Sequence, residues 1–306
     1  MKTTIVITGG TGLIGNRLAE LLPAEKYDLR ILTRKVRPTR DNISYYGWDP
    51  LNGEIDISVF DACDFVITLA GAGIADKRWT SKRKKLIIDS RVKGNELIRT
   101  SLAKLNHRPK AIVSASAIGF YGDREDEILT ESSAVGSPEF LTESTLAWEN
   151  SIHRLDEFTE RLCTIRIGIV LSTKGGALEK MLIPLNFGIS GYFGNGSQYY
   201  SWIHIDDLCQ LFITAIEDSN WDGIYNGVSP DPIPLKEFAK AIKNVKLPIA
   251  IAAPVPEALL KLAMGEMTKM LTNSTRVVPK RALDQGFEFQ FTDLKPAVID
   301  IIENEK

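Results

Sequence analysis

Short apolar runs alternate with amphipathic stretches along the first half of the chain. The runs lie at 4–8, 28–33, 64–70, 110–116 and 163–171. Apolar residues that recur at the spacing of one helix face predict a helix over 81–105, and a further helix is expected over 143–155. Strands that are separated by helices imply right-handed crossovers and a parallel sheet. The pattern therefore predicts an α/β fold with a doubly wound parallel sheet.

The first apolar run leads into a glycine-rich turn of sequence TGGTGLIG at 8–15. In such a turn the first glycine permits a tight bend, the second lets the backbone approach a pyrophosphate, and the third lets the new helix pack closely on the strand. The helix N-terminus favours anionic phosphates, because its N–H groups are unpaired and its dipole is positive there. The turn therefore predicts a dinucleotide site of the Rossmann type. The residues expected to form it are Gly9, Gly12, Leu13, Ile14 and Gly15.

Thr33 and Arg34 stand at the end of the second run, about 20 residues beyond the glycines, where a site selective for NAD has a carboxylate for the ribose 2′-hydroxyl. A guanidinium instead binds a 2′-phosphate through two parallel hydrogen bonds. The sequence thus favours NADP over NAD as cofactor. The alternative is a solvated arginine at a strand end.

The pattern changes after residue 171. Glycine-rich and aromatic segments follow, then shorter helices and a last segment that begins at about 252. We therefore divide the chain into a dinucleotide-binding domain, 1–171, and a smaller substrate-side lobe, 172–306. No low-complexity tract or disordered linker separates the two parts, so the lobe is expected to pack on the sheet.

Charge and composition narrow the class of partner. With 306 residues, 44% of them hydrophobic, and a net charge of -2, nothing favours nucleic acid or an anionic membrane. The basic cluster 82–85 is interpreted as a solvated helix face rather than a binding patch. A strand that directly follows Lys2 argues against a secretory signal, and no apolar run reaches the roughly 20 residues of a membrane span, so we expect a cytoplasmic protein. Three scattered cysteines and three histidines show no metal-ligand spacing, so no metal site is expected.

Several motifs, in this order and spacing, resemble the extended short-chain dehydrogenase/reductase superfamily. They are the TGGTGLIG turn, Leu69-Ala70-Gly71, the stretch 114–123 and the WIHIDD sequence at 202–207. More narrowly, the segment 74–79, the pair Gly175-Gly176 and the segment from about 252 resemble the "epimerase family" group, which is named for nucleoside-diphosphate-sugar epimerases and carries a C-terminal domain of unknown function. The resemblance implies that the groove for the dinucleotide is also lined by Leu69, Ala70, Gly71, Arg91 and Val170.

The chain departs from the superfamily at its proton-transfer pair. Members with established chemistry carry a Tyr-x-x-x-Lys pair, in which the tyrosine exchanges a proton with the substrate oxygen and the lysine lowers the tyrosine pKa. Counting back from Glu149, the equivalent positions are about Leu141 and Thr145, and no such pair occurs between Ser116 and Ile165. We therefore expect little or no epimerase activity of the usual kind.

Ser116 and Tyr121 are the nearest candidates for chemistry. Ser114 and Ser116 end a strand and are expected to face the cofactor side, because ligands in open α/β sheets lie beyond the carboxyl ends of strands. The resemblance implies that Ser116 occupies the position of the catalytic serine; its alternative is a hydroxyl that caps the turn. For Tyr121, packing with the hydroxyl bonded to backbone is an equal alternative to proton transfer.

Other polar and aromatic residues of the lobe have structural alternatives. Asp206 or Asp207 is expected to cap the helix that begins near Leu208. A structural role is favoured for His204. Either a substrate wall or packing between the lobes is expected for Gln198, Tyr199 and Trp202. Ordinary helix packing is expected for Met264, Met267 and Met270.

Two functions follow from these observations. One is an NADP-dependent oxidoreductase or epimerase that acts on an unidentified small molecule. The other is a dinucleotide-binding pseudoenzyme, in which cofactor occupancy sets the conformation of the lobe and thereby a protein interaction. The sequence leaves the oligomeric state open.

Overall fold

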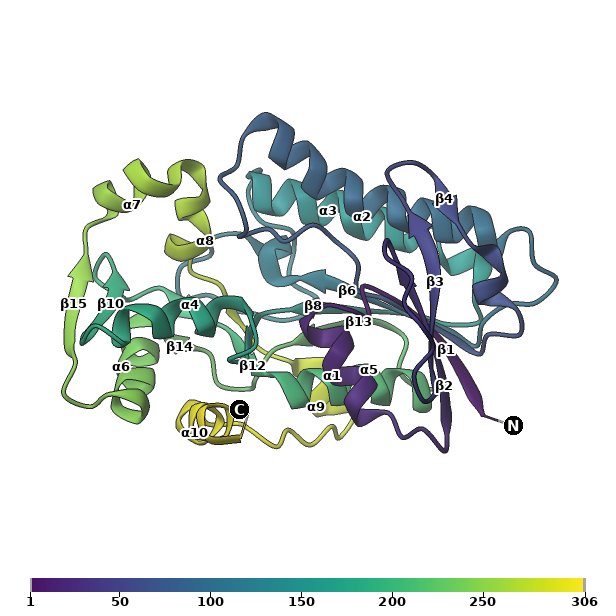
Figure 1. Cartoon of the computed structure of the whole chain (residues 1–306). Coiled ribbons are helices and arrows are strands. Elements are labelled where there is room, and N and C mark those ends of the chain that lie inside the picture. The colour runs from purple at the N-terminus through teal and green to yellow at the C-terminus, as the bar shows by residue number, and fades with distance from the viewer. Residues whose placement is uncertain (1, 305–306) are drawn as a thin grey trace.

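The computed structural model describes residues 2–304 and is built around an eight-stranded sheet of order β13-β8-β6-β5-β1-β2-β3-β4 (Figure 1). All neighbouring strands pair in parallel except β3 and β4. The sheet consists of β1 (Thr3–Thr8), β2 (Tyr27–Thr33), β3 (Ile43–Asp49), β4 (Glu54–Ile55), β5 (Phe65–Thr68), β6 (Ala111–Ala117), β8 (Leu162–Ile167) and β13 (Gly223–Gly227). The predicted fold class is confirmed.

Helices cover both faces of this sheet. Figure 1 shows α2 (Ser81–Leu102) and α3 (Phe140–His153) on one face, and α1 (Leu13–Leu21) and α5 (Ile205–Glu217) on the other. Because the central strands are buried from both sides, they are continuously apolar rather than alternating, as in β1. No helix within residues 2–304 has the length and apolar character needed to cross a membrane.

The strand order places a topological switch point between β1 and β5. The chain leaves β1 toward β2 on one side and later returns to β5 on the other side. Ligands of open α/β sheets bind in the crevice outside the carboxyl ends of the strands at such a point. The turn after β1 and the residues after β5 flank this crevice.

A second apolar core lies beyond the sheet and includes Leu171, Trp202 and Phe238. Its main elements are α4 (Gly176–Leu185), α6 (Leu235–Lys246), α10 (Leu294–Asn304) and the parallel strands β10 (Ile189–Phe193) and β15 (Ile251–Val255). The short strands β11 (Tyr199–Tyr200) and β14 (Ile233–Pro234) pair there, and β16 (Arg276–Val277) pairs with β7 (Ile128–Leu129). The short helices α7 (Glu257–Met264) and α8 (Lys269–Thr272) also belong to the lobe, whereas α9 (Lys280–Asp284) packs on β13, and its Ala282 is part of the core of the large sheet. Trp202 is fully buried in this core, which supports its packing role.

The strand predicted over 163–171 is two strands. It breaks at Gly168 into β8 and β9 (Ile169–Leu171), and β9 pairs with β12 (Trp202–His204) outside the large sheet. A Cβ at Gly168 would lie 2.5 Å from the Ser201 carbonyl oxygen, so glycine permits this close approach. The large sheet also continues past residue 171, because β13 forms its edge beside β8. The boundary at 171 therefore does not coincide with the edge of the sheet, and the division into two domains stays a prediction.

The WIHIDD sequence ties three parts of the chain together. His204, and not the predicted Asp206 or Asp207, is the N-cap of α5, and its Nδ1 accepts a hydrogen bond from the Asp206 N–H at 3.1 Å. The Asp207 carboxylate accepts hydrogen bonds from the N–H groups of Gln290 and Phe291 at 2.8 and 2.9 Å. These bonds give the predicted structural histidine a capping role and fasten the C-terminal segment to α5.

Candidate functional site

The turn after β1 forms an open cradle of backbone. Gly9 has a φ of 69°, and a Cβ there would lie 2.9 Å from the Ala70 nitrogen. Gly15 packs on Gly10, where a Cβ would lie 2.4 Å from the Gly10 Cα. Gly12 is the N-cap of α1, and no side chain caps this helix end. Gly9 and Gly15 therefore have the steric roles predicted for the first and third glycines, whereas the approach of a pyrophosphate at Gly12 stays a prediction. Thr11, Gly12 and Leu13 line a small cavity at this end of α1, where unpaired N–H groups favour an anion.

The residues after β5 lie directly beside this turn. The Thr8 hydroxyl oxygen accepts hydrogen bonds from the N–H groups of Leu69 and Ala70 at 3.1 and 3.2 Å. The next residue, Gly71, is close to the Arg91 guanidinium, since a Cβ at Gly71 would lie 2.8 Å from Arg91 Cζ. The structure thus brings Leu69, Ala70 and Gly71 to the crevice, as predicted.

Arg91 is held by its own chain. Its Nη1 donates hydrogen bonds to the carbonyl oxygens of Ala72 and Ile87 at 3.1 and 3.0 Å, and the guanidinium lies 4.7 Å from the Trp148 ring centroid. Burial lowers the Arg91 pKa to about 10, and the nearby positive charge of Arg83 acts in the same direction. Arg91 therefore holds the loop after β5 in place through the Ala72 carbonyl oxygen. Its contact with a dinucleotide stays a prediction.

Arg34 lies on the surface at the end of β2. Thr33 is buried, and its hydroxyl oxygen accepts a hydrogen bond from the Lys35 N–H at 3.3 Å. Arg34 is exposed and forms no ion pair with any of residues 2–304. An unpaired guanidinium next to a buried strand end fits a phosphate group, because it can donate two parallel hydrogen bonds to it.

Val170 belongs to β9, and the loop after this strand approaches the start of α1. A Cβ at Gly176 would lie 3.5 Å from the Val170 carbonyl oxygen and 3.8 Å from the Leu13 side chain. The predicted groove residues Leu13 and Val170 are therefore brought together by the glycine pair 175–176.

Ser116 is part of a buried polar chain that begins at the end of β6. It is 2% exposed, and its hydroxyl donates a hydrogen bond to the Glu149 carboxylate at 2.6 Å. Arg166 on β8 binds the same carboxylate through two bonds of 2.8 Å each. Ser114 is fully buried and accepts a hydrogen bond from Thr68 at 2.8 Å, so it does not face the open crevice as expected.

Tyr121 continues the same chain of contacts. It is 0% exposed, its hydroxyl accepts a hydrogen bond from Arg166 Nη1 at 2.9 Å, and it donates one to Asn226 Oδ1 at 2.7 Å. Burial raises the pKa of the Tyr121 phenol above its usual value, although Arg166 opposes this effect. This arrangement supports packing rather than proton transfer by Tyr121, because a proton donor near neutral pH needs a lowered pKa.

The positions of the missing proton-transfer pair lie in α3, which packs against β6 and the turn that follows it. The Thr145 hydroxyl donates to the Leu141 carbonyl oxygen at 2.8 Å, and a Cβ at Gly119 would lie 3.2 Å from the Thr145 hydroxyl oxygen. Leu141 packs against an apolar cluster at the N-terminal ends of α2 and α3. The cluster consists of Ile74, Trp79, Ile87, Ile88, Phe140, Leu141, Met264, Met267 and Met270.

The three methionines, predicted to serve in helix packing, thus pack the C-terminal segment against α2 and α3. Polar contacts hold the segment there as well: Lys84 on α2 binds Glu266, and Lys269 lies 3.1 Å from the Glu139 carboxylate. The basic cluster 82–85 is accordingly engaged in part with the protein itself. We call the methionine-bearing segment 264–272 the methionine cap.

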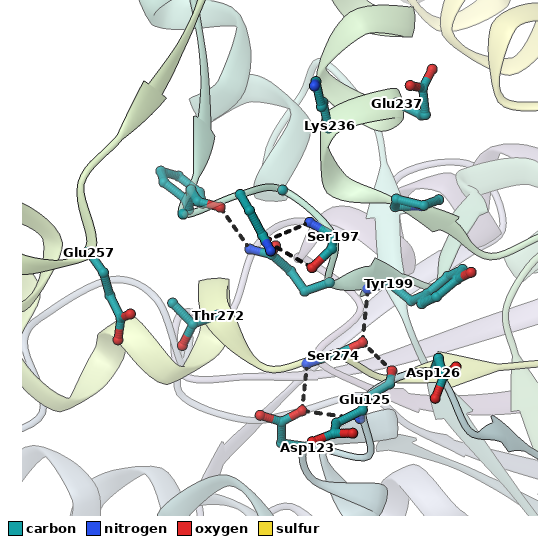
Figure 2. Close-up of a pocket in the computed structure, with 16 residues that line it drawn as sticks. Asp123, Glu125, Asp126, Ser197, Tyr199, Lys236, Glu237, Glu257, Thr272 and Ser274 are labelled. Carbon is teal, nitrogen blue, oxygen red and sulfur yellow. Dashed lines mark hydrogen bonds between the residues drawn. The ribbon is translucent and has the colours of Figure 1, made fainter.

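Figure 2 shows a hollow between the lobe and the loop that follows Tyr121. Its volume is about 1110 Å³. Asp123 Oδ1 accepts a hydrogen bond from the Ser274 N–H at 3.0 Å, and the Tyr199 N–H donates to the Ser274 hydroxyl oxygen at 3.0 Å. Gln198 and Tyr199 line the hollow, and their role as a substrate wall stays a prediction. Its charged lining residues are Asp123, Glu125, Asp126, Lys236, Glu237 and Glu257. In residues 2–304 no group of three or more metal-ligating side chains has an arrangement that could hold a metal ion.

Three members of the polar chain were not predicted from the sequence: Glu149, Arg166 and Asn226. Their partners are distant along the chain, since 105 positions separate Tyr121 from Asn226. One signal was present: Arg166 is a charged residue inside the apolar run of β8, and a buried charge must have a partner.

Comparisons with known proteins agree with this geometry. The model for the NAD dependent epimerase/dehydratase family matches residues 5–226, and a domain of unknown function, DUF1731, matches residues 255–301. The epimerase family protein YfhF of Bacillus subtilis is 34% identical over 99% of both chains. The mouse epimerase family protein SDR39U1 is 30% identical over 97% of this chain and 99% of its own. The human epimerase family protein SDR39U1, crystallised with NADPH, is 29% identical, with a TM-score of 0.87 over 99% of this chain and 100% of its own.

These matches confirm the resemblance that the motifs indicated and extend it to both parts of the chain. The turn after β1, the switch point and the C-terminal segment all lie within the matched ranges. The chain belongs to the NAD dependent epimerase/dehydratase family and carries its C-terminal DUF1731 segment.

Proposed function

We propose that this protein binds NADPH in the crevice after β1 and β5, and that it acts as a cofactor-responsive binding protein rather than as a sugar-nucleotide epimerase. One observation carries the second part: the hydroxyls of Ser116 and Tyr121 are already bonded inside the fold. A general acid must reach the substrate oxygen with a free proton, and neither hydroxyl is positioned to do so.

Three observations support NADPH as the ligand. Thr11, Gly12 and Leu13 line a cavity of about 200 Å³ at the start of α1, where no side chain caps the helix and an anion is favoured. Arg34 is exposed and has a free guanidinium at the strand end where the 2′-phosphate is expected. The human relative was crystallised with NADPH.

The methionine cap supports the role of a binding protein. About where the superfamily has the catalytic tyrosine, Leu141 belongs to the apolar cluster that also includes Met264, Met267 and Met270. The apolar side chain at position 141 is therefore suited to hold the methionine cap against α2 and α3. Cofactor binding can then change the position of the methionine cap. The acidic lining of the hollow in Figure 2 also disfavours a nucleoside diphosphate there, because its carboxylates outnumber Lys236 and would repel the phosphates.

A fluorescence titration tests the cofactor assignment. Arg34→Ala should weaken NADPH binding by about 10- to 100-fold, since a charge-assisted contact contributes roughly 1.5 to 3 kcal/mol, and should leave NADH binding unchanged. Arg40→Ala is the matched control, because Arg40 is an exposed arginine nearby that pairs with Asp41. Equal affinity of the native protein for NADPH and NADH would contradict the assignment.

A turnover assay of the same protein tests the chemistry. With UDP- and dTDP-sugars and simple aldehydes, NADPH absorbance and product chromatography should show no turnover or very slow turnover, because positioned acid-base groups usually contribute about 10² to 10⁴-fold. Robust turnover would overturn the role of a binding protein and support an NADP-dependent oxidoreductase.

A further inference from the structure

A small cavity of about 200 Å³ opens at the N-terminus of α1. One wall is the turn, with Thr11, Gly12 and Leu13. The other wall comes from beyond residue 171: Lys174, in the loop between β9 and α4, and Ile205, the first residue of α5. The substrate-side lobe therefore reaches the part of the crevice where the turn and the helix dipole favour an anion.

Two cations, Arg17 and Lys174, line this cavity, and only one of them is bound in an ion pair within residues 2–304. The Arg17 guanidinium binds Asp206 at 2.6 and 2.8 Å and Glu20 at 2.8 Å. Against the effect of burial, Arg17 keeps the pKa of Asp206 below its usual value, and the charges of His204 and Lys174 act in the same direction. Asp206 is therefore ionised and pairs directly with Arg17, whereas Lys174 lies near it without a direct ion pair. The Lys174 side chain forms no ion pair or hydrogen bond with any residue from 2 to 304.

The backbone places Lys174 over the turn. Its N–H donates a hydrogen bond to the Ser172 hydroxyl oxygen at 3.1 Å. The next two residues, Gly175 and Gly176, have φ values of 156° and 86°, so the chain turns sharply into α4. A Cβ at either glycine would lie within 3.9 Å of the Leu13 side chain, so the loop rests on the first residue of α1.

We infer that Lys174 binds the pyrophosphate of the dinucleotide, so that the lobe supplies one cation to the cofactor site. This inference rests on the proposed function. A pyrophosphate on the turn carries two negative charges, and the helix dipole provides only about half a positive charge against them. Lys174 adds a full charge on the side of the pyrophosphate opposite the turn. Occupancy of the site then pulls the loop 172–176, and with it α4, toward the sheet.

Binding measurements on three variants test this role. Lys174→Met, which keeps the length of the side chain, should weaken the binding of both NADPH and NADH about tenfold, whereas Lys174→Arg should retain most of the affinity. Adenosine 2′-monophosphate, which has a 2′-phosphate but no pyrophosphate, should bind Lys174→Met as it binds the native protein. Arg34→Ala should show the opposite pattern, losing NADPH and adenosine 2′-monophosphate but not NADH. The salt dependence of NADPH binding should also be shallower in Lys174→Met.

Lys246→Met is the matched control, since Lys246 is an exposed lysine of α6 that does not line the cavity, and thermal unfolding checks the fold of each variant. Unchanged NADPH and NADH affinities in a folded Lys174→Met protein would overturn the inference and leave the proposed function in place. An equal loss of adenosine 2′-monophosphate binding would also overturn it. A native protein that binds neither NADPH nor NADH would overturn both.

Discussion

The turn after β1 and the edge around Ser116 lie at the same end of one sheet, yet their polar groups are used in opposite ways. At the turn, no side chain caps α1, and the side chains of Arg34 and Lys174 make no direct ion pair or hydrogen bond with residues 2–304. At the edge, each hydroxyl is buried and bonded, and Glu149 is bound by two partners.

This difference separates ligand binding from chemistry. Free polar groups at a surface crevice lose little by staying hydrated and gain when an anion binds. Buried polar groups that satisfy one another stabilise a unique fold, and their protons and lone pairs are no longer available to a substrate. The turn therefore has the kind of polar groups that the proposed NADPH site needs, whereas the polar groups around Ser116 are bonded within the fold.

The largest effect is expected from breaking the buried side of the comparison. Arg166→Met leaves the largely buried Glu149 carboxylate without its charged partner, and should lower the free energy of unfolding by about 3 to 5 kcal/mol. Chemical denaturation followed by circular dichroism measures this loss. In the double variant Glu149→Gln, Arg166→Met the loss should be smaller than for Arg166→Met alone, because no unpaired charge remains. A single variant as stable as the native protein would show that the polar chain is not a stabilising element.

Breaking the open side should abolish binding without unfolding the protein. Gly12→Val places a branched side chain where the pyrophosphate must lie, and should weaken NADPH binding by about 100-fold or more. The backbone of Gly12, at a φ of -86°, is one that valine adopts, so the fold should survive. Fluorescence titration gives the affinity, and circular dichroism is the control for folding. Native affinity in the folded variant would refute the cradle as the phosphate site.

Tyr121→Phe removes a single buried hydroxyl oxygen and has the smallest expected effect. Asn226 Oδ1 and Arg166 Nη1 would each lose a partner, so stability should fall by about 1 to 3 kcal/mol while the affinity for NADPH stays unchanged. Tyr45→Phe, on the more exposed strand β3, is the matched control and should lose far less. A Tyr121→Phe protein that keeps full stability but loses an observed turnover would assign chemistry to Tyr121 after all.

The central fold could be predicted from the sequence because its signals are local. The apolar run of β1 and the glycines after it specify the strand, the turn and the start of α1 within about a dozen residues. The strand β3 was missed, because its sequence ISYYGWD is mostly half-buried and lacks the continuous apolar character of the central strands. The strand β13 was missed for a similar reason, since GIYNG has glycine at both ends and is typical of a turn.

The candidate site could be predicted only in part, for a physical reason. Glycine positions and Arg34 follow from spacing within one βα unit. The pairing of Ser116 with Glu149 and Arg166, or of Leu141 with the methionine cap, depends on which elements the tertiary fold brings together. Spacing along the chain carries no such information, and only the unexpected charge of Arg166 in an apolar strand hinted at it.

The position of β13 at the sheet edge has a consequence for synthesis on the ribosome. β8 emerges at residues 162–167, but its outer neighbour follows only at 223–227, so the nascent chain exposes a mostly apolar strand of six residues with unpaired backbone groups along one side. Such an edge is a template for pairing with other chains. A fragment that ends at residue 171 should therefore aggregate, whereas in a fragment that extends through β13 the edge of β8 is paired. We expect chaperones to bind the nascent chain after β8 has emerged and before β13 has been synthesised.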